Sequence, residues 1–292
     1  MPESLSDKNS SVAKQWNYSR NAEDHPARIL YREKPMSFAW TGRLYAKLYR
    51  QVFADLNVRQ VSCLEIGCGS GDNLFLLSDL GIIGHALGID IADAPLGLAR
   101  QKKINGGYKN IDFFCTAYEH YPTDQQVDLV LAMQFINYME DLGYFFDKLS
   151  KLIKNGGYVI LFDGQSPTNG VVTMLKQNNL IRGLFGKKPV VSYLHYWNSD
   201  YVVSVASRYG FRLRRVSYYC HFLCGLIVPA MYRLVVAEWR HETTRFLARR
   251  AYVLARRVVE YKNNRLEQKR GGKLYFVLLE KCDQKCCSSA PV

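Results

Sequence analysis

The 292-residue sequence has no apolar run long enough to cross a lipid bilayer. The stretch 222–237 is apolar apart from Arg233, but it contains Pro229 and is shorter than the roughly 20 residues that a spanning helix needs. Residues 1–17 are polar and lack the apolar core of a secretory signal peptide. We therefore expect a cytoplasmic protein, with peripheral attachment to a membrane as the alternative that the charge pattern raises below.

Paired cysteines and metal-ligand clusters are also missing. The eight cysteines show no secretory disulfide framework, which favours reduced thiols in the cytosol. Three of them fall on or beside predicted buried strands: Cys63, Cys68 and Cys115. Three more form a C-terminal cluster: Cys282, Cys286 and Cys287. Neither a histidine nor a fourth cysteine lies near this cluster, so we expect a reduced tail and no metal, with a lipid anchor as the alternative.

The positive charge is spread unevenly along the chain. Residues 56–163 contain 8 Lys/Arg against 13 Asp/Glu, a net charge of −5, whereas residues 240–273 contain 11 against 3, a net charge of +8. The overall charge of +13 therefore comes from flanking and inserted segments and not from the central region. Whatever the basic segments bind, we do not expect them to hold the ligand of the motif described next.

That motif is a glycine-rich turn in Val61–Gly71. A short apolar run, Val61–Ile66, contains the acid Glu65, and glycines then occupy alternate positions before an amphipathic stretch at 72–80. This order predicts a buried strand, a tight turn and a helix start, an arrangement that brings a nucleotide-like cofactor against backbone N–H groups. Glycine permits positive φ and close approach of a ligand at such a turn. The glycines concerned are Gly67, Gly69 and Gly71.

A second apolar run, 85–90, ends in Asp90, about 20 residues after the glycine turn, where an acid accepts hydrogen bonds from a ribose diol. Nicotinamide enzymes share this feature, so Asp90 alone does not select the cofactor. The spacing G-x-G-x-G and the carboxylate of Glu65 do, because a negative charge there repels a pyrophosphate and suits the ammonium and sulfonium groups of S-adenosylmethionine.

With these motifs the sequence resembles the class I S-adenosylmethionine-dependent methyltransferases that act on small molecules and lipid-like substrates. The resemblance covers about residues 58–220 and returns at 273–281; it rests on Glu65–Gly71, Gly88–Asp90, Val127–Val130 and Lys154–Gly157. It implies S-adenosylmethionine as the cofactor, S-adenosylhomocysteine as the product, and a Rossmann-like α/β fold. That fold has a seven-stranded sheet with an antiparallel last strand, an N-terminal helical lid and a helical insertion before the last strand.

The expected strands are 61–66, 85–90, 111–115, 127–132, 158–162, 211–219 and 273–279, and the expected helices are 37–56, 72–80, 94–104, 140–154 and 198–208. We read the chain as one α/β domain, 58–281, with the insertion at about 220–270. A disordered tail at 1–17, a lid at 18–57 and a flexible tail at 282–292 complete the expected organisation.

The resemblance also implies the residues of the site. Those expected to bind the cofactor are Glu65, Gly67, Cys68, Gly69, Gly71, Asp90, Ile91, Ala117, Tyr118, Met133 and Gln134. Those expected to face the acceptor are Tyr18, Asn137, Tyr138 and Tyr196, with Arg20 and Tyr31 as further lid residues. Thr116 stands where the family often has an acid that reaches the adenine amine, a departure that leaves this contact to backbone groups or Tyr118.

Catalysis is harder to assign. His195, in the aromatic run 193–197, is the candidate general base, with a structural role as the alternative. Asn137 either faces the substrate or caps the helix that begins near Glu140. Asp163, after the fifth strand, either faces the substrate or forms a turn.

The insertion suggests a partner. Residues 238–261 form an amphipathic helical pattern with five arginines on one side: Arg245, Arg249, Arg250, Arg256 and Arg257. With the apolar stretch before it, the 222–270 region suits an anionic membrane surface or a phosphorylated substrate, and the alternative is a packed helix with a solvated basic face. Nucleic acid is disfavoured, because no RNA-binding module is present and the fourth strand lacks an Asn/Asp-Pro-Pro-aromatic ending. No sequence feature indicates an oligomeric state.

Together these features predict a methyltransferase that acts on a small-molecule or lipid-like acceptor at oxygen or nitrogen. Two other functions stay open at this point. One is a nicotinamide-dependent oxidoreductase, and the other is a catalytically silent methyltransferase-like subunit that supports a partner.

Overall fold

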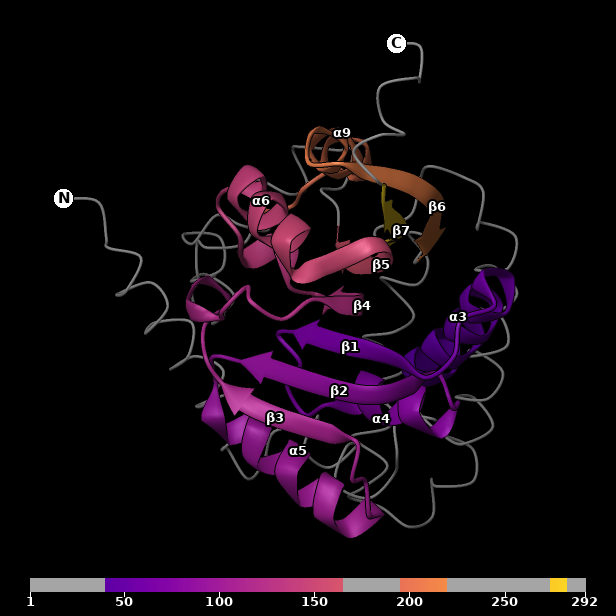
Figure 1. Cartoon of the computed structure of the whole chain (residues 1–292), viewed down its shortest axis with the longest axis vertical. Coiled ribbons are helices and arrows are strands. Elements are labelled where there is room, and N and C mark those ends of the chain that lie inside the picture. Colours follow the sequence, from indigo (N-terminus) through magenta and orange to yellow (C-terminus); the bar gives the residue numbers. More distant parts are fainter. Residues whose placement is uncertain (1–39, 165–194, 220–273, 283–292) are drawn as a thin grey trace, which may run out of the picture. The chain divides into compact units, whose positions relative to one another are not determined.

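The computed structural model describes residues 40–164, 195–219 and 274–282, and the side chains from residue 46 onward (Figure 1). Several predicted features lie outside these residues: Tyr18 and the other lid residues before position 40, the loop at 166–188, the basic segment at 222–270, and Cys286 and Cys287.

The described strands form one seven-stranded sheet in the order β3-β2-β1-β4-β5-β7-β6. The strands are β1 (Val61–Ile66), β2 (Ile83–Asp90), β3 (Ile111–Cys115), β4 (Val127–Met133), β5 (Ile153–Gly164), β6 (Phe211–Tyr219) and β7 (Leu274–Lys281). The helices are α3 (Trp40–Leu56), α4 (Asp72–Asp79), α5 (Asp93–Gly106), α6 (Leu142–Leu152) and α9 (Ser199–Arg208), with two short 3₁₀ turns, η2 (Tyr118–His120) and η3 (Ile136–Tyr138). The predicted fold class is therefore confirmed.

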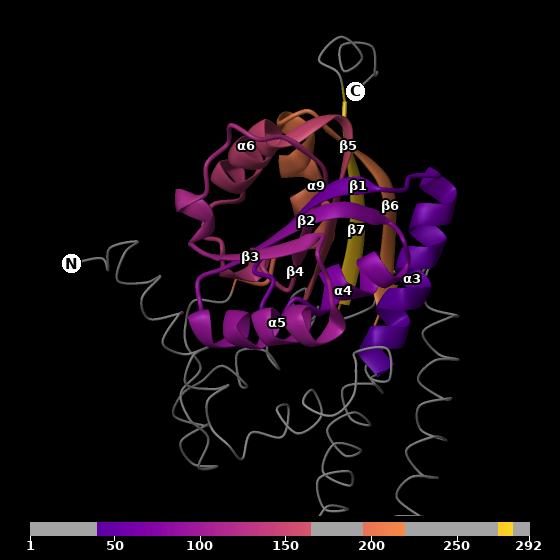
Figure 2. The same cartoon turned by 60° about the horizontal axis from the view of Figure 1, so that its bottom comes forward.

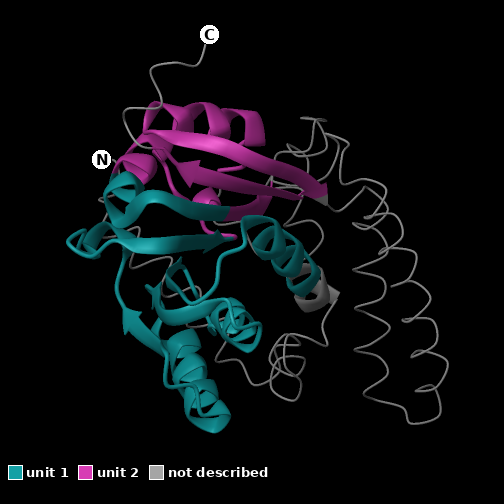
Figure 3. Ribbon diagram, turned by 45° about the vertical axis from the view of Figure 1, so that its right-hand side comes forward, with its two compact units in different colours: residues 1–133, 148–160 teal, residues 134–147, 161–292 magenta. Residues whose placement is uncertain are grey.

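The chain divides into two compact units, shown in teal and magenta in Figure 3. Unit 1 contains residues 1–133 and 148–160, and unit 2 contains residues 134–147 and 161–292.

Unit 1 is a parallel βα arrangement. β1 pairs in parallel with β2 on one side and with β4 on the other, and β3 pairs in parallel with β2. α4 packs against β2 and α5 runs along β3, as Figures 1 and 2 show. Continuous apolar runs are typical of such buried parallel strands, and Leu64, Ile66, Val130 and Ala132 are all buried.

Unit 2 contains the reversed end of the sheet. β6 pairs antiparallel with β7 from Phe211–Lys281 to Tyr219–Leu274, as the resemblance implied. α9 packs against β6, and its first turn is capped by the Asn198 side chain, which accepts from the N–H of Asp200. Three aromatic rings form part of the core, with centroids 5.1 Å apart for Phe145 and Phe146 and 5.8 Å apart for Phe146 and Phe211.

Two local expectations differ from the structure. The helix expected at 140–154 ends at Leu152, and β5 begins at Ile153, before the turn expected at Asn155–Gly157. Gly156 still has a positive φ of 76°, so the sharp bend lies inside the strand span. Cys115 is exposed and Phe114 is 57% exposed, because β3 is the outermost strand and only its first residue, Ile111, is buried.

Candidate functional site

The glycine turn of unit 1 joins β1 to α4 in an unusual backbone conformation. Gly67, Gly69 and Gly71 have φ values of 70°, 53° and 71°, in the left-handed region that L-residues rarely adopt. At Gly71 an added Cβ would lie 2.6 Å from the Phe113 ring, so this position also needs the absence of a side chain. The sequence thus folds into a bare backbone loop at the carboxyl end of a buried parallel strand, which is where doubly wound sheets bind ligands.

Asp90, at the carboxyl end of β2, holds this loop. Its Oδ2 accepts a hydrogen bond of 2.7 Å from the N–H of Gly69, and its Oδ1 accepts one of 2.9 Å from the N–H of Ala92. The loop is also fixed by the carbonyl of Ile89, the residue before Asp90 on β2, which accepts from the N–H groups of Gly67 and Cys68 at 2.8 and 3.0 Å. Asp90 is half-buried, and each carboxylate oxygen can accept a second hydrogen bond from a ligand.

Glu65 lies on β1 and is only 1% exposed. Its Oε1 accepts a hydrogen bond of 2.7 Å from the Asn73 side chain on α4, whereas its Oε2 has no hydrogen-bond partner among the described residues. Burial raises the pKa of Glu65 to about 8; the Asn73 hydrogen bond opposes this shift, and the charges of Asp72 and Asp90 add to it. A buried carboxyl group with one unsatisfied oxygen favours a cationic or hydrogen-bond-donating ligand.

The other expected cofactor residues of unit 1 line the ends of the neighbouring strands. Cys68, Ala117, Tyr118 and Met133 are buried, and Ile91 is half-buried directly after β2. The ring of Tyr118 has the Lys148 ammonium 5.3 Å from its centroid. The Lys148 ammonium therefore lies over the Tyr118 ring in a cation–π arrangement, which sequence reasoning did not predict.

The expected site residues of unit 2 gather around η3. Gln134, which we expected to bind the cofactor, precedes η3 with a φ of 56°, and its backbone N–H donates to the Phe162 carbonyl at 2.6 Å. Asn137 is buried; its N–H donates to Asp163 Oδ2 at 3.2 Å and its side-chain amide donates to Asp163 Oδ1 at 2.5 Å. The alternative of Asn137 as a helix cap is wrong, because α6 begins only at Leu142 and Asn137 is bonded to β5 instead.

Asp163 is an anchor for this turn. It is 3% exposed, and it also accepts a hydrogen bond of 2.8 Å from the N–H of Gly164. Burial raises the pKa of Asp163 to about 7, against the lowering effect of its backbone hydrogen bonds. Burial also raises the pKa of Tyr275, with a further contribution from the charge of Asp163, and the Tyr275 hydroxyl has no partner among the described residues. Sequence reasoning did not single out Tyr275, which has the pattern of an ordinary strand residue.

His195 is tied to the same turn. The backbone N–H of His195 donates to the carbonyl of Asn137 at 2.7 Å, and the His195 ring stacks on Trp197 with centroids 5.3 Å apart. The indole N–H of Trp197 reaches the carbonyls of Ile136 and Met139 at 3.1 and 3.3 Å. Within unit 2 the structure therefore brings His195 next to Asn137, while Tyr138 is half-buried and Tyr196 is 40% exposed.

Comparisons with known proteins agree with this geometry. Residues 57–195 match a family model described as a methyltransferase domain. A ubiquinone biosynthesis O-methyltransferase of Nitrobacter winogradskyi is 28% identical over 109 residues, which are 35% of this chain and 41% of that protein. The match thus spans less than half the length of this curated relative.

Solved structures share the fold. The magnesium protoporphyrin IX methyltransferase of Synechocystis, solved with S-adenosylhomocysteine bound, has a TM-score of 0.58 at 15% identity and covers 94% of this chain and 100% of its own. The [4+2]-cyclase SpnF has a TM-score of 0.51 at 14% identity and covers 81% of this chain and 80% of its own. At these identities the likeness shows the fold alone.

Proposed function

Since this chain belongs to the class I S-adenosylmethionine-dependent methyltransferase superfamily, we propose that it transfers a methyl group from S-adenosylmethionine to a small-molecule or lipid-like acceptor. The acceptor atom in this proposal is oxygen or nitrogen. The proposed cofactor residues are those of the glycine loop with Glu65, Asp90 and the strand-end residues of β3 and β4.

The observation that carries the proposal is the loop of three left-handed glycines fixed by Asp90 beside the orphaned oxygen of Glu65. The acidic groups of this site are Glu65, Asp72 and Asp90, and the charges of the two aspartates add to the raised pKa of Glu65. This environment suits an amino group or sulfonium and opposes the pyrophosphate of a nicotinamide dinucleotide. An oxidoreductase is therefore the weaker assignment.

S-adenosylmethionine, when bound, supplies an activated methyl group, so the protein has mainly to align the acceptor and exclude water. In unit 2, the Asp163–Asn137 pair and the Trp197 indole fix η3 and the backbone at His195. We assign His195 the role of removing a proton from a hydroxyl acceptor, and Asn137, Tyr138 and Tyr196 the role of contacting it.

The name of the curated relative from Nitrobacter, an O-methyltransferase of ubiquinone biosynthesis, supports an oxygen acceptor. The basic segment 222–270 suits an acceptor that is lipid-like or carries phosphate, or attachment to an anionic membrane surface. No described helix is long and apolar enough to cross a bilayer.

A catalytically silent role remains the second candidate. One protein with this fold is named a [4+2]-cyclase, which illustrates that the fold by itself does not determine methyl transfer. A chain that binds the cofactor but methylates acceptors only when a second subunit is added would favour this candidate.

The first test uses a glycine of the loop. Gly67→Arg places a bulky cation at a left-handed position, so we expect S-adenosylhomocysteine to raise the melting temperature of the wild-type chain but not of this variant. Gly97→Arg is the matched control, because Gly97 is exposed on α5 and nothing lies within 4 Å of an added Cβ. Equal stabilisation of all three proteins, each shown folded by circular dichroism, would contradict the proposed site.

A further inference from the structure

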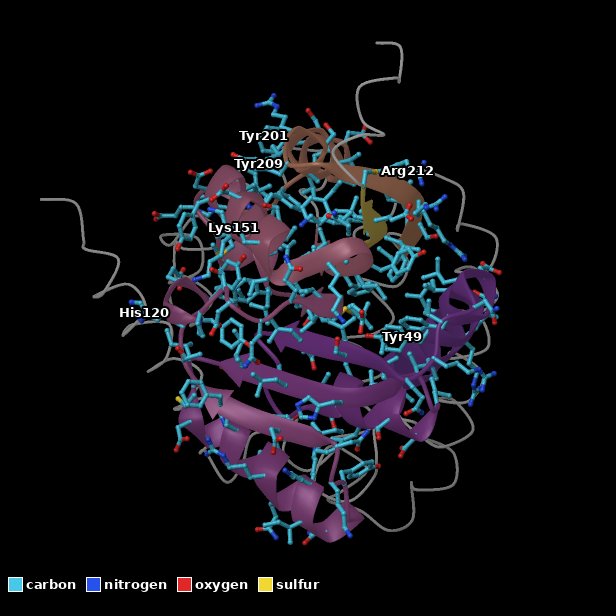
Figure 4. The ribbon with its side chains drawn as sticks, in the orientation of Figure 1. Tyr49, His120, Lys151, Tyr201, Tyr209 and Arg212 are labelled. Atoms are coloured by element: carbon cyan, nitrogen blue, oxygen red, sulfur yellow. The ribbon has the colours of Figure 1, made fainter. Side chains whose placement is uncertain are left out.

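A chain of hydrogen bonds inside unit 1 links α3 to the glycine-loop strand. The Tyr49 hydroxyl donates to Asn73 Oδ1 at 3.1 Å, and Asn73 Nδ2 donates to Glu65 Oε1 at 2.7 Å. All three side chains are buried, with exposed fractions of 0%, 8% and 1%. Figure 4 labels Tyr49 on α3, 24 residues before Asn73 in the sequence.

The direction of these bonds fixes the Asn73 amide. Because the phenol donates to Oδ1, the NH₂ group must point toward Glu65 rather than away from it. An amide turned the other way would present its oxygen to the carboxyl group, and that arrangement requires Glu65 to be protonated. The hydrogen bond from Tyr49 therefore supports the orientation that also tolerates an ionised Glu65.

Among the described residues, the surroundings of Glu65 provide little else for an ionised carboxylate. The titratable groups of that part of the chain that act on it are Cys63 on β1, Asp72 on α4 and Asp90 on β2, which are neutral or acidic. Burial raises the pKa of Glu65 to about 8, so its carboxyl is mostly protonated at pH 7 in the cofactor-free protein. A cationic group brought to Oε2 reverses this balance, because an opposite charge favours the ionised form.

We propose that cofactor binding releases a proton from Glu65 to solvent, and that Tyr49 is the positioning residue that sets this linkage through Asn73. The inference rests on the proposed function and deepens it: the cofactor site is coupled to pH and to the N-terminal helix α3. The group that displaces the proton is the amino cation of the cofactor's methionyl part, which S-adenosylhomocysteine also carries.

The test is calorimetric titration with S-adenosylhomocysteine at pH 7 in two buffers of different ionisation enthalpy, which counts protons released on binding. For the wild-type chain we expect release approaching one proton, and an affinity that rises by up to about tenfold per pH unit between pH 6 and 7. Glu65→Gln should remove the Glu65 share of the release and flatten the pH dependence, because glutamine has no proton to lose.

Tyr49→Phe isolates the positioning role. With the phenol absent, Asn73 is free to turn, the protonated form of Glu65 is favoured, and the affinity at pH 7 should fall severalfold while recovering at higher pH. Tyr108→Phe is the matched control, because the Tyr108 hydroxyl also bonds α4, at Asp79 with a distance of 2.7 Å, but lies outside the chain of bonds to Glu65. It should behave like the wild type.

The outcomes separate the two claims. If the wild type binds S-adenosylhomocysteine and releases as many protons as Glu65→Gln does, the proton linkage is overturned and the proposed function still stands. A Tyr49→Phe pH profile equal to that of the wild type would overturn the role of Tyr49. No binding by folded wild-type protein at any pH would overturn the proposed function and the inference with it.

Discussion

Glu65 in unit 1 and Asp163 in unit 2 are both buried, and burial is the main cause that raises the pKa of each carboxyl group. The hydrogen bonds around the two groups differ. Among the described residues, Glu65 has one hydrogen-bond donor and an unsatisfied oxygen, whereas Asp163 accepts from the backbone N–H and the side-chain amide of Asn137 and from the N–H of Gly164. We therefore regard Glu65 as poised for a ligand and Asp163 as an anchor for the turn that carries Asn137.

The raised pKa of Asp163 has a consequence for stability. Its ordinary value is 3.8 and its value in the folded chain is about 7, so the folded state holds a proton that the unfolded state has lost between these pH values. The free energy of unfolding should therefore fall as pH rises from about 4 to 7, by at most about 1.4 kcal/mol per pH unit from this group.

Asp163→Asn isolates this contribution. The variant loses stability at acid pH because asparagine replaces an acceptor of several hydrogen bonds, but it lacks the titration, so its deficit relative to the wild type should shrink as pH rises. Urea unfolding of both proteins at several pH values between 4 and 8 measures the difference. Parallel stability curves would show that Asp163 is already ionised in the folded chain.

Residues such as Tyr49 and Asn73 mark where sequence reasoning stops. The acid of Glu65 and the spacing of Gly67, Gly69 and Gly71 are local patterns, and local patterns predict a strand, a turn and their chemistry. The contact between Tyr49 and Asn73 depends on how α3 packs onto α4. The two residues are 24 positions apart, so no local sequence pattern predicts their hydrogen bond or its direction. The same holds for Asp163 and Asn137, which are 26 residues apart.

At the scale of the element, the glycine loop is specified by backbone geometry. Gly71 has a φ of 71° and would place a Cβ 2.6 Å from the Phe113 ring, whereas Gly81 has a φ of 68° with nothing within 4 Å. We expect Gly81→Ala to cost about 1–2 kcal/mol from the left-handed conformation, and Gly71→Ala to cost measurably more because of the added clash.

Chemical unfolding of the two alanine variants gives this comparison directly. The Gly71→Ala variant should also lose affinity for S-adenosylhomocysteine, while Gly81→Ala keeps it, because only the first distorts the loop. Equal destabilisation by the two substitutions would mean that the Phe113 ring moves aside without cost.

The elements that sequence reasoning placed best are those with the strongest local pattern. β1 and β3 have the predicted bounds, and β6 has the predicted span from Phe211 to Tyr219. The end of α6 was misplaced because Lys154 and Asn155 suit a helix end, whereas β-branched Ile153 is already drawn into β5. The exposure of β3 was missed because an edge position is a property of sheet order and not of the strand's own residues.

At the scale of the whole molecule, sheet order and charge divide the chain by role. The parallel strands of unit 1 hold the glycine loop with Glu65 and Asp90, and the antiparallel pair β6 and β7 belongs to unit 2 with η3 and His195. The basic surplus, 11 Lys/Arg against 3 Asp/Glu, lies in residues 240–273, outside the described part. In our proposal, cofactor binding and partner binding therefore fall on segments of opposite charge.

The central claim is that this loop binds S-adenosylmethionine. Calorimetric titration of the wild-type chain with S-adenosylhomocysteine, with NADH as the control ligand, tests it most directly. The account predicts micromolar binding of S-adenosylhomocysteine at one site per chain and no heat of binding from NADH. Binding of NADH alone would contradict it and favour a nicotinamide-dependent oxidoreductase. Binding of neither ligand by folded protein would also contradict it and make Glu65 and Asp90 architectural residues of the fold.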